Sequence, residues 1–185
     1  MRIISGQHKG RALKAPAGIR PTEDRVKKAF FDIIDVADAD FCELFAGSGA
    51  VGFEALSHGA KSVIFVEKDR QCVRILEANL KGLNKTEAGI RAEVFSMDAQ
   101  EAIHLLFKKG RKFDILFLDP PYSAGLAEKS LQSLEAYDIL NPSGFVCVQH
   151  FKKNLLPQDF GAFQLWRQAQ YGDTVLSFYK RTQAE

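Results

Sequence analysis

The stretch from Phe113 to Tyr122 constrains the fold more than any other part of this 185-residue chain. Residues 113–118 are almost wholly apolar, which is typical of a fully buried strand. Pro120 and Pro121 must end that strand, because proline has no N–H to donate to a neighbouring strand. Asp119 is therefore predicted at the carboxyl end of a buried strand, where open α/β sheets bind ligands.

The residues Asp119, Pro120, Pro121 and Tyr122 are suited to a planar base that carries an amino group. Since prolines lack an N–H, the stretch presents mainly acceptors, namely the Asp119 carboxylate and backbone carbonyls. Two N–H bonds can be accepted there while Tyr122 stacks on the ring. We take these four residues as candidate catalytic residues; the alternative is a proline-rich turn with a solvated acid.

Strand and helix patterns alternate along the rest of the chain. Strands are expected at Cys42–Ala46, Ser62–Val66, Arg91–Phe95, Phe113–Leu118, Phe145–Gln149, Phe163–Gln168 and Val175–Tyr179. Helices are expected at Ala50–His58, Arg70–Leu80, Ala99–Phe107 and Ala127–Tyr137. This order predicts a doubly wound, mostly parallel α/β sheet with helices on both faces and an antiparallel finish.

The first part of the chain is predicted to form a small extension. Arg2–Ser5 and Arg11–Ala15 resemble two short strands of a hairpin, and Thr22 can cap a helix from Glu23 to about Ile34. We expect a single domain, in which residues 1–35 form this extension and residues 36–185 the catalytic core.

Basic residues are concentrated in this extension. Residues 1–28 hold eight Lys or Arg against two acids, a net +6, whereas the whole chain carries only +2. A basic end on a near-neutral body is typical of a protein with a polyanionic partner, although short charge runs also occur on solvated surfaces. The candidate substrate-binding residues are Arg2, Lys9, Arg11, Arg20 and Arg25.

A glycine-rich loop follows the strand predicted at Cys42–Ala46 and opens the next helix. Gly47, Gly49 and Gly52 fit G-x-G-x-x-G, in which glycines allow a ligand close to the backbone and the helix start attracts an anion. Glu67 ends the next strand, where an acid can accept both ribose hydroxyls. A nicotinamide dehydrogenase would show a similar pattern.

Three features favour a different nucleotide-like cofactor. Glu43 lies just before the loop, where an acid can pair with the amino group of an amino-acid-like ligand. Asp98 could accept from an adenine amino group and Met97 could pack on its ring, although Asp98 is equally suited to cap the following helix. Asp119 and its prolines have no role in hydride transfer.

Composition limits the remaining classes of function. The chain has no apolar run long enough to span a bilayer and no signal peptide, and Met1 leads directly into a strand pattern. Cys42, Cys72 and Cys147 are odd in number with no close pair, so we expect buried thiols in a cytoplasmic protein, with neither a disulfide framework nor a metal site.

Taken together, these stretches resemble the class I methyltransferases that use S-adenosylmethionine. More narrowly, the chain is similar to the RsmD-type enzymes, which methylate N2 of a guanine in bacterial 16S ribosomal RNA (guanine-966 type). The resemblance covers nearly the whole chain. The segments that carry it are 2–6, 9–11, 20–26, 44–49, 54–60 and 119–122.

This resemblance implies a Rossmann-like, seven-stranded sheet and a set of site residues. The cofactor-binding set is Glu43, Phe45, Gly47, Ser48, Gly49, Glu67, Lys68, Met97, Asp98, Ala99 and Thr22. The implied partner is 16S ribosomal RNA within an assembling small subunit, bound by a monomer without metal or membrane. A DNA amino-methyltransferase, a nicotinamide oxidoreductase and a non-enzymatic RNA-binding assembly factor stay open as alternatives.

Overall fold

The computed structural model describes residues 1–16, 23–84, 90–121 and 125–182. The strands are β1 (Asp40–Leu44), β2 (Ser62–Glu67), β3 (Ala92–Ser96), β4 (Phe113–Leu118), β5 (Leu140–Phe151), β6 (Asp159–Phe160), β7 (Phe163–Tyr171) and β8 (Thr174–Arg181). The helices are α1 (Asp24–Ile33), α2 (Ala50–Ser57), α3 (Arg70–Asn84), α4 (Ala99–Lys108) and α5 (Leu126–Ala136).

The strands described form one eight-stranded sheet in the order β3-β2-β1-β4-β5-β8-β7-β6. The first five strands along the chain pair in parallel, and β8, β7 and β6 pair antiparallel. This confirms the predicted doubly wound, mostly parallel architecture. Two details differ: β5 is twelve residues long, and the two-residue edge strand β6 was not predicted.

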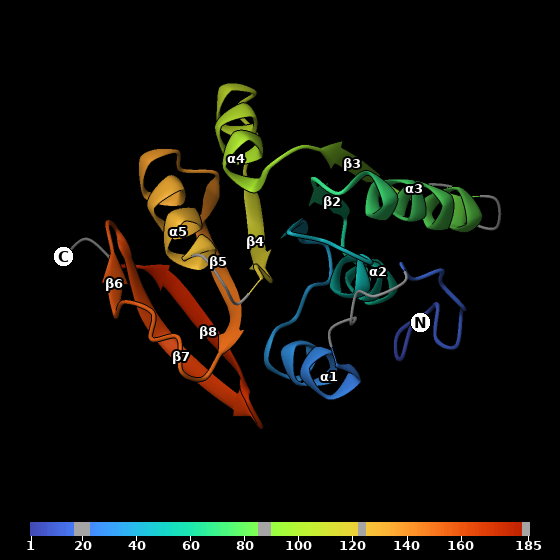
Figure 1. Ribbon diagram of the computed structural model, residues 1–185, viewed down its shortest axis with the longest axis horizontal. Coiled ribbons are helices and arrows are strands. Elements are labelled where there is room, and N and C mark those ends of the chain that lie inside the picture. Colours follow the sequence, from blue (N-terminus) through green and yellow to red (C-terminus); the bar gives the residue numbers. More distant parts are fainter. Residues whose placement is uncertain (17–22, 85–89, 122–124, 183–185) are drawn as a thin grey trace.

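Two layers of helices cover the sheet, α1 to α3 on one face and α4 with α5 on the other (Figure 1). Alternating side chains divide between the two layers along each strand. In β4, Ile115 and Phe117 join the cluster that contains Phe30 of α1, whereas Leu116 and Leu118 join the cluster that contains Ile103 of α4. The central strand is therefore buried on both faces, as its sequence predicted.

The N-terminal segment packs on α2. Ile3 and Leu13 belong to the same core cluster as α1, and a single antiparallel bridge between Arg2 and Ala12 stands where two short strands were expected. Gly6, with φ of 75°, lies so close to α2 that a Cβ there would come within 2.1 Å of the Ser57 carbonyl oxygen.

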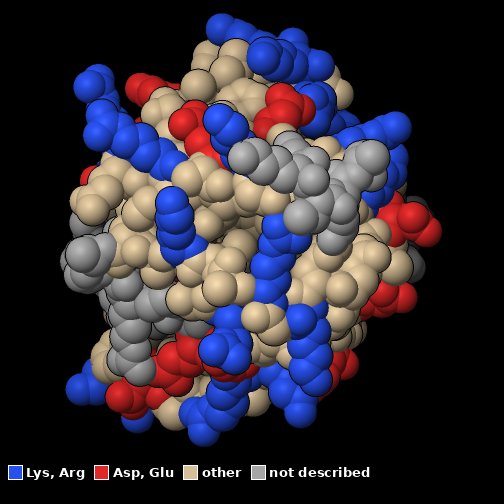
Figure 2. Space-filling view, turned by 90° about the vertical axis from the view of Figure 1, so that its right-hand side faces the viewer, with Lys and Arg blue, Asp and Glu red and all other residues tan. Residues whose placement is uncertain are grey.

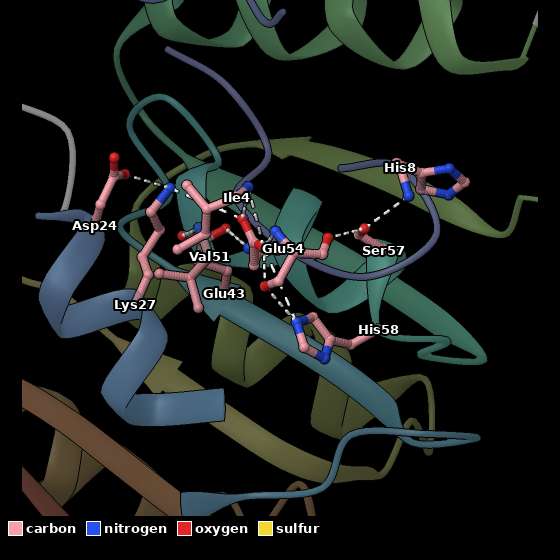
Figure 3. Close-up of polar contacts among 11 residues, drawn as sticks. Ile4, His8, Asp24, Lys27, Glu43, Val51, Glu54, Ser57 and His58 are labelled. Carbon is pink, nitrogen blue, oxygen red and sulfur yellow. Dashed lines mark hydrogen bonds and ion pairs between the residues drawn. The ribbon is translucent and has the colours of Figure 1, made fainter. Parts of the chain in front are cut away.

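The buried carboxylate of Glu54 holds this segment on α2 (Figure 3). It accepts hydrogen bonds from the backbone N–H of Ile4 at 3.0 Å and of Ser5 at 2.7 Å, and from the Ser5 hydroxyl at 2.6 Å. The ammonium of Lys27, buried in α1, lies 3.9 Å from Glu54 and 3.1 Å from Asp24. Lys27 is thus an interior residue and not part of a basic surface.

All three cysteines are buried and free, as expected. None of the helices in the described part of the chain is long and apolar enough to cross a membrane.

We predict that Glu54→Gln lowers the free energy of unfolding by roughly 1–3 kcal/mol, because the new amide NH₂ cannot accept from the N–H of Ile4 or Ser5. Urea denaturation measures the change. Glu77→Gln on the exposed face of α3 is the matched control and should alter stability little. Equal midpoints for the two variants would show that Glu54 does not anchor the segment.

Candidate active site

A cavity of about 810 Å³ lies at the carboxyl ends of the parallel strands, within the size range of small-molecule sites. Its lining comes from α1, the loops after β1, β2, β3 and β4, the end of β5 and the turn between β7 and β8. The lining residues are Glu23, Arg25, Val26, Phe45, Ala46, Gly47, Ser48, Val66, Glu67, Lys68, Met97, Ala99, Asp119, Pro120, Pro121, Leu126, Gln149, Phe151, Tyr171, Gly172, Asp173 and Thr174.

The loop from Phe45 to Ser48 forms one wall, and Gly49, which we predicted as a cofactor residue, lies just behind the lining. Gly49 precedes α2 with φ of 73°, and a Cβ on it would come within 2.5 Å of Leu76. Phe45 also has a positive φ, 62°, which is rare for a residue with a side chain. Such backbone conformations cost energy and persist only where the surrounding packing holds them in place. They are found most often at ligand sites.

Glu67 ties this loop to the end of β2. One carboxylate oxygen accepts from the Gly47 N–H at 2.7 Å, and the other accepts from the Asp69 N–H at 2.8 Å. Each oxygen retains further acceptor capacity, so the carboxylate that shapes the loop can also accept from ligand hydroxyls.

Glu43 does not line the cavity, although we predicted it as a cofactor residue. It lies on β1 between Cys42 and Leu44, which face α4, so its own side chain faces α2. There it accepts from the N–H of Gly52 at 2.8 Å and of Val51 at 3.3 Å. Burial raises the pKa of Glu43 to about 8, against the lowering effect of these two hydrogen bonds.

Asp98 caps α4, which is the alternative left open by the sequence. One of its oxygens accepts from the Gln100 N–H at 3.1 Å, and the other lies 3.6 Å from the Lys68 ammonium. Its neighbours Met97 and Ala99 line the cavity, whereas Asp98 does not.

Asp119, Pro120 and Pro121 line the cavity where β4 ends. The Asp119 N–H donates to the Leu44 carbonyl at 3.3 Å, which holds the start of the proline turn against the end of β1. The predicted site residues Thr22, Arg20 and Tyr122 lie outside the described residues.

Only some of the predicted basic residues reach the cavity. Arg25 lines it and lies against the β7–β8 turn, because a Cβ on Gly172 would come within 3.2 Å of its guanidinium. Arg2 and Lys9 are exposed on the N-terminal segment, and Arg11 donates to the Gly82 carbonyl at 2.6 Å. Figure 2 shows Lys and Arg spread over the face that carries this segment.

Sequence reasoning missed the part of the lining that β5 and the β7–β8 turn supply. Gln149 is the last residue of the strand predicted at Phe145–Gln149, and this place at the carboxyl end of a strand was a signal that could have identified it. Residues 171–173 are expected from the sequence only as the link between the strands Phe163–Gln168 and Val175–Tyr179, and nothing local in residues 171–174 indicates a site.

Comparison with known proteins decides the family. The profile of a family described as "Conserved hypothetical protein 95" matches residues 1–180. A putative rRNA methyltransferase, YlbH, of Bacillus subtilis is 38% identical over 98% of this chain and 99% of its own. Ribosomal RNA small subunit methyltransferase D of Escherichia coli is 36% identical over 98% of this chain and 90% of its own. The chain belongs to the RsmD family.

Solved structures agree with membership of the RsmD family. The putative methyltransferase yhhF from Escherichia coli superposes with a TM-score of 0.85 at 34% identity, covering 98% of this chain and 97% of that one. A hypothetical protein, TTHA0928, from Thermus thermophilus has a TM-score of 0.83 at 33% identity, covering 97% and 99%. The predicted class I methyltransferase fold is therefore confirmed.

We predict that Glu43 makes stability depend on pH. Its folded-state pKa of about 8 lies above the ordinary value of 4.5, so its contribution is present below pH 4.5 and is lost as the pH rises toward 8. Relative to Glu43→Gln, the wild type should lose about 1.4 kcal/mol of stability per pH unit over this interval. Denaturant unfolding of both proteins at several pH values tests this; a constant difference between them would contradict it.

Proposed function

We propose that this protein transfers a methyl group from S-adenosylmethionine to the exocyclic N2 of a guanine in small-subunit ribosomal RNA. The observation that carries the proposal is the shared cavity: the acceptor-rich Asp119, Pro120 and Pro121 lie in the same cavity as the glycine loop and Glu67. The relatives YlbH and ribosomal RNA small subunit methyltransferase D, both named for rRNA methylation, support the reaction class and the substrate class.

The residues present fit the proposed cofactor. Gly47 and Ser48 would border its methionine end, because the loop backbone is open to the cavity there. Glu67 would accept from the ribose hydroxyls, and Met97 and Ala99 would flank the adenine. When bound, the sulfonium would supply an electrophilic methyl group. In this arrangement Glu43 and Asp98 act indirectly, Glu43 by holding the start of α2 and Asp98 by capping α4.

Asp119 is proposed to make the amino group a better nucleophile. The lone pair of guanine N2 is delocalised into the ring. Accepting one N–H at the Asp119 carboxylate and the other at a carbonyl of the proline turn localises that pair toward the methyl group. As the methyl group passes from sulfur to nitrogen, positive charge would develop on nitrogen beside a carboxylate already in place, which would stabilise the transition state. The donor would leave as the neutral thioether S-adenosylhomocysteine, and the methylated nitrogen would release its extra proton to water. The site contributes further by holding both reactants in line and excluding water.

The substrate RNA would lie along the basic N-terminal segment. Arg2, Lys9 and Lys14 are exposed there, and Arg25 continues the positive charge into the cavity. We propose that a monomer acts in the cytoplasm on 16S ribosomal RNA of an assembling small subunit, with residues 1–35 as the RNA-holding part. Within the described residues no cluster of His, Cys, Asp or Glu is arranged to hold a metal ion.

We predict that Asp119→Ala lowers the rate of methyl transfer by roughly 100-fold or more while preserving the fold and cofactor binding. The charge that Asp119 meets develops only during transfer, so the loss should appear in turnover and not in affinity. The measurement is single-turnover transfer of labelled methyl to RNA with both substrates saturating. Mass spectrometry of the digested RNA identifies the methylated nucleoside, so a product other than N2-methylguanine would exclude the proposed function.

Asp159→Ala, on the exposed edge strand β6, is the matched control for that experiment and should transfer methyl at the wild-type rate. Asn at position 119 is a poorer test, since its amide oxygen still accepts one N–H. If the Asp119→Ala protein transferred methyl at close to the wild-type rate, Asp119 would have only a structural role in the turn.

We further predict that replacing Arg2, Lys9 and Lys14 together with Gln weakens RNA binding and flattens its salt dependence. The log–log slope should fall by roughly 0.7–0.9 for each phosphate that the variant no longer neutralises. Surface substitution is the appropriate test, because deleting the segment would remove the core residues Ile3 and Leu13.

The control for this prediction is a triple Gln variant of Lys108, Lys109 and Lys129, which are exposed on and just after α4 and on α5. This variant also removes three positive charges, but from the helical layer on the other face of the sheet. It should leave the salt slope of RNA binding close to the wild-type value. Equal slopes for the two triple variants would show that the N-terminal segment does not hold the RNA.

A further inference from the structure

Gln149 lies beside Asp119 at the carboxyl edge of the sheet. The parallel strands β4 and β5 pair Leu118 with Val148, so Asp119 and Gln149 are the next residues on neighbouring strands. Val148 faces α4 and α5 whereas Cys147 faces α1, so alternation turns the Gln149 side chain toward α1. There it lines the cavity together with Arg25.

The amide oxygen of Gln149 has no hydrogen-bond donor among the described residues. The side chain is only 5% exposed, and buried polar atoms are almost always paired because an unpaired one is costly. Its neighbour His150 shows the usual situation: one ring nitrogen lies 2.7 Å from the Ser177 hydroxyl, and the other lies 3.1 Å from the Phe151 carbonyl. An unpaired amide oxygen in a cavity wall indicates that a ligand supplies its partner.

Sheet order divides the cavity into two parts. β4 lies between β1 and β5, so Asp119 separates the glycine loop after β1 from the residues of β5 and the β7–β8 turn. The proposed cofactor occupies the part that contains Glu67. The part that contains Gln149 and Arg25 is therefore left for the base whose amino group meets Asp119.

Two neighbouring acceptors in the protein can distinguish guanine from the other bases that carry an amino group. In guanine the N2 amino group is next to N1–H, so two donors are adjacent. In adenine and cytosine the amino group is next to a bare ring nitrogen, which is an acceptor. In the proposed arrangement Asp119 and a carbonyl of the proline turn accept both N–H bonds of the amino group. A third donor, for the Gln149 oxygen, must then come from the neighbouring ring nitrogen, and among these bases guanine alone has one there.

We propose that Gln149 is the residue that selects guanine, by accepting a hydrogen bond from N1–H while Asp119 accepts from N2. Rotation about the last bond of the side chain, which has a broad energy minimum, turns the oxygen toward the base. This inference rests on the proposed function, since it assumes that the amino group held by Asp119 is the methyl acceptor.

The test compares two RNA substrates in two proteins. RNA that the wild type methylates is prepared with guanine or with 2-aminopurine at the target position; 2-aminopurine keeps the amino group but has a bare N1. Wild type should prefer guanine in kcat/KM, and Gln149→Met should reduce that preference about 10-fold or more, the effect of removing one hydrogen bond to a buried partner. Because 2-aminopurine also lacks O6, only the change in preference between the proteins is diagnostic.

Two further variants make the result specific. Gln149→Glu keeps an acceptor and should retain the preference for guanine, whereas Gln164→Met, an exposed substitution on β7, should change nothing. Since the Gln149 oxygen has no partner to lose, Gln149→Met should lower the stability of the cofactor-free protein less than loss of a fully hydrogen-bonded glutamine would.

The outcomes separate this inference from the function on which it rests. If wild type forms no N2-methylguanine, the proposed function fails. If wild type forms it and Gln149→Met slows both substrates equally, or neither, the proposed function stands and the role of Gln149 is overturned. If the Met variant does not fold, an unchanged preference in Gln149→Ala overturns the role equally.

Discussion

β1 and β4 are buried on both faces, so ligand-binding groups can gather only beyond the points where these strands end. The two helical layers require apolar side chains on each side of the sheet, and parallel pairing brings the carboxyl ends of β1, β2, β4 and β5 to one edge. The glycine loop, Glu67, Asp119 and Gln149 all lie at that edge. The position of the site follows from burial before any chemistry is considered.

Helix α2 connects the parts of this arrangement. Glu43 fixes its first turn through the N–H of Val51 and Gly52, and Glu54 fixes the N-terminal segment to its middle. Both carboxylates are buried, and removing the acceptor of such a pair leaves donors unsatisfied. The loop proposed to hold the cofactor and the segment proposed to hold RNA are thus positioned by the same short helix.

The sequence was sufficient to predict the sheet, the mostly parallel direction of its strands and the loops at its edge. These features depend on local patterns of apolar runs, glycines and prolines. The sequence was insufficient to predict where the Glu43 side chain points, because an almost wholly apolar strand does not reveal which face of the sheet each residue lies on. Asp98 was predicted with two alternatives, and the cap is the contact that the structure shows. Gln149 was missed although it ends the strand predicted at Phe145–Gln149. The place of the β7–β8 turn depends on pairing between distant strands, which no local pattern records. Glu54 was missed for the same reason, because its partners Ile4 and Ser5 are about fifty residues away.

The last strand along the chain lies inside the sheet, between β5 and β7. Among the described strands, β7 and β6 are therefore hydrogen-bonded to the rest of the sheet only through β8, and the turn that joins β7 to β8 supplies part of the cavity wall. During synthesis, a chain that has not yet reached residue 174 has an unfilled edge on β5 and an incomplete cavity. The cavity wall is therefore complete only once β8 has paired with β5, so the site depends on residues from both halves of the chain.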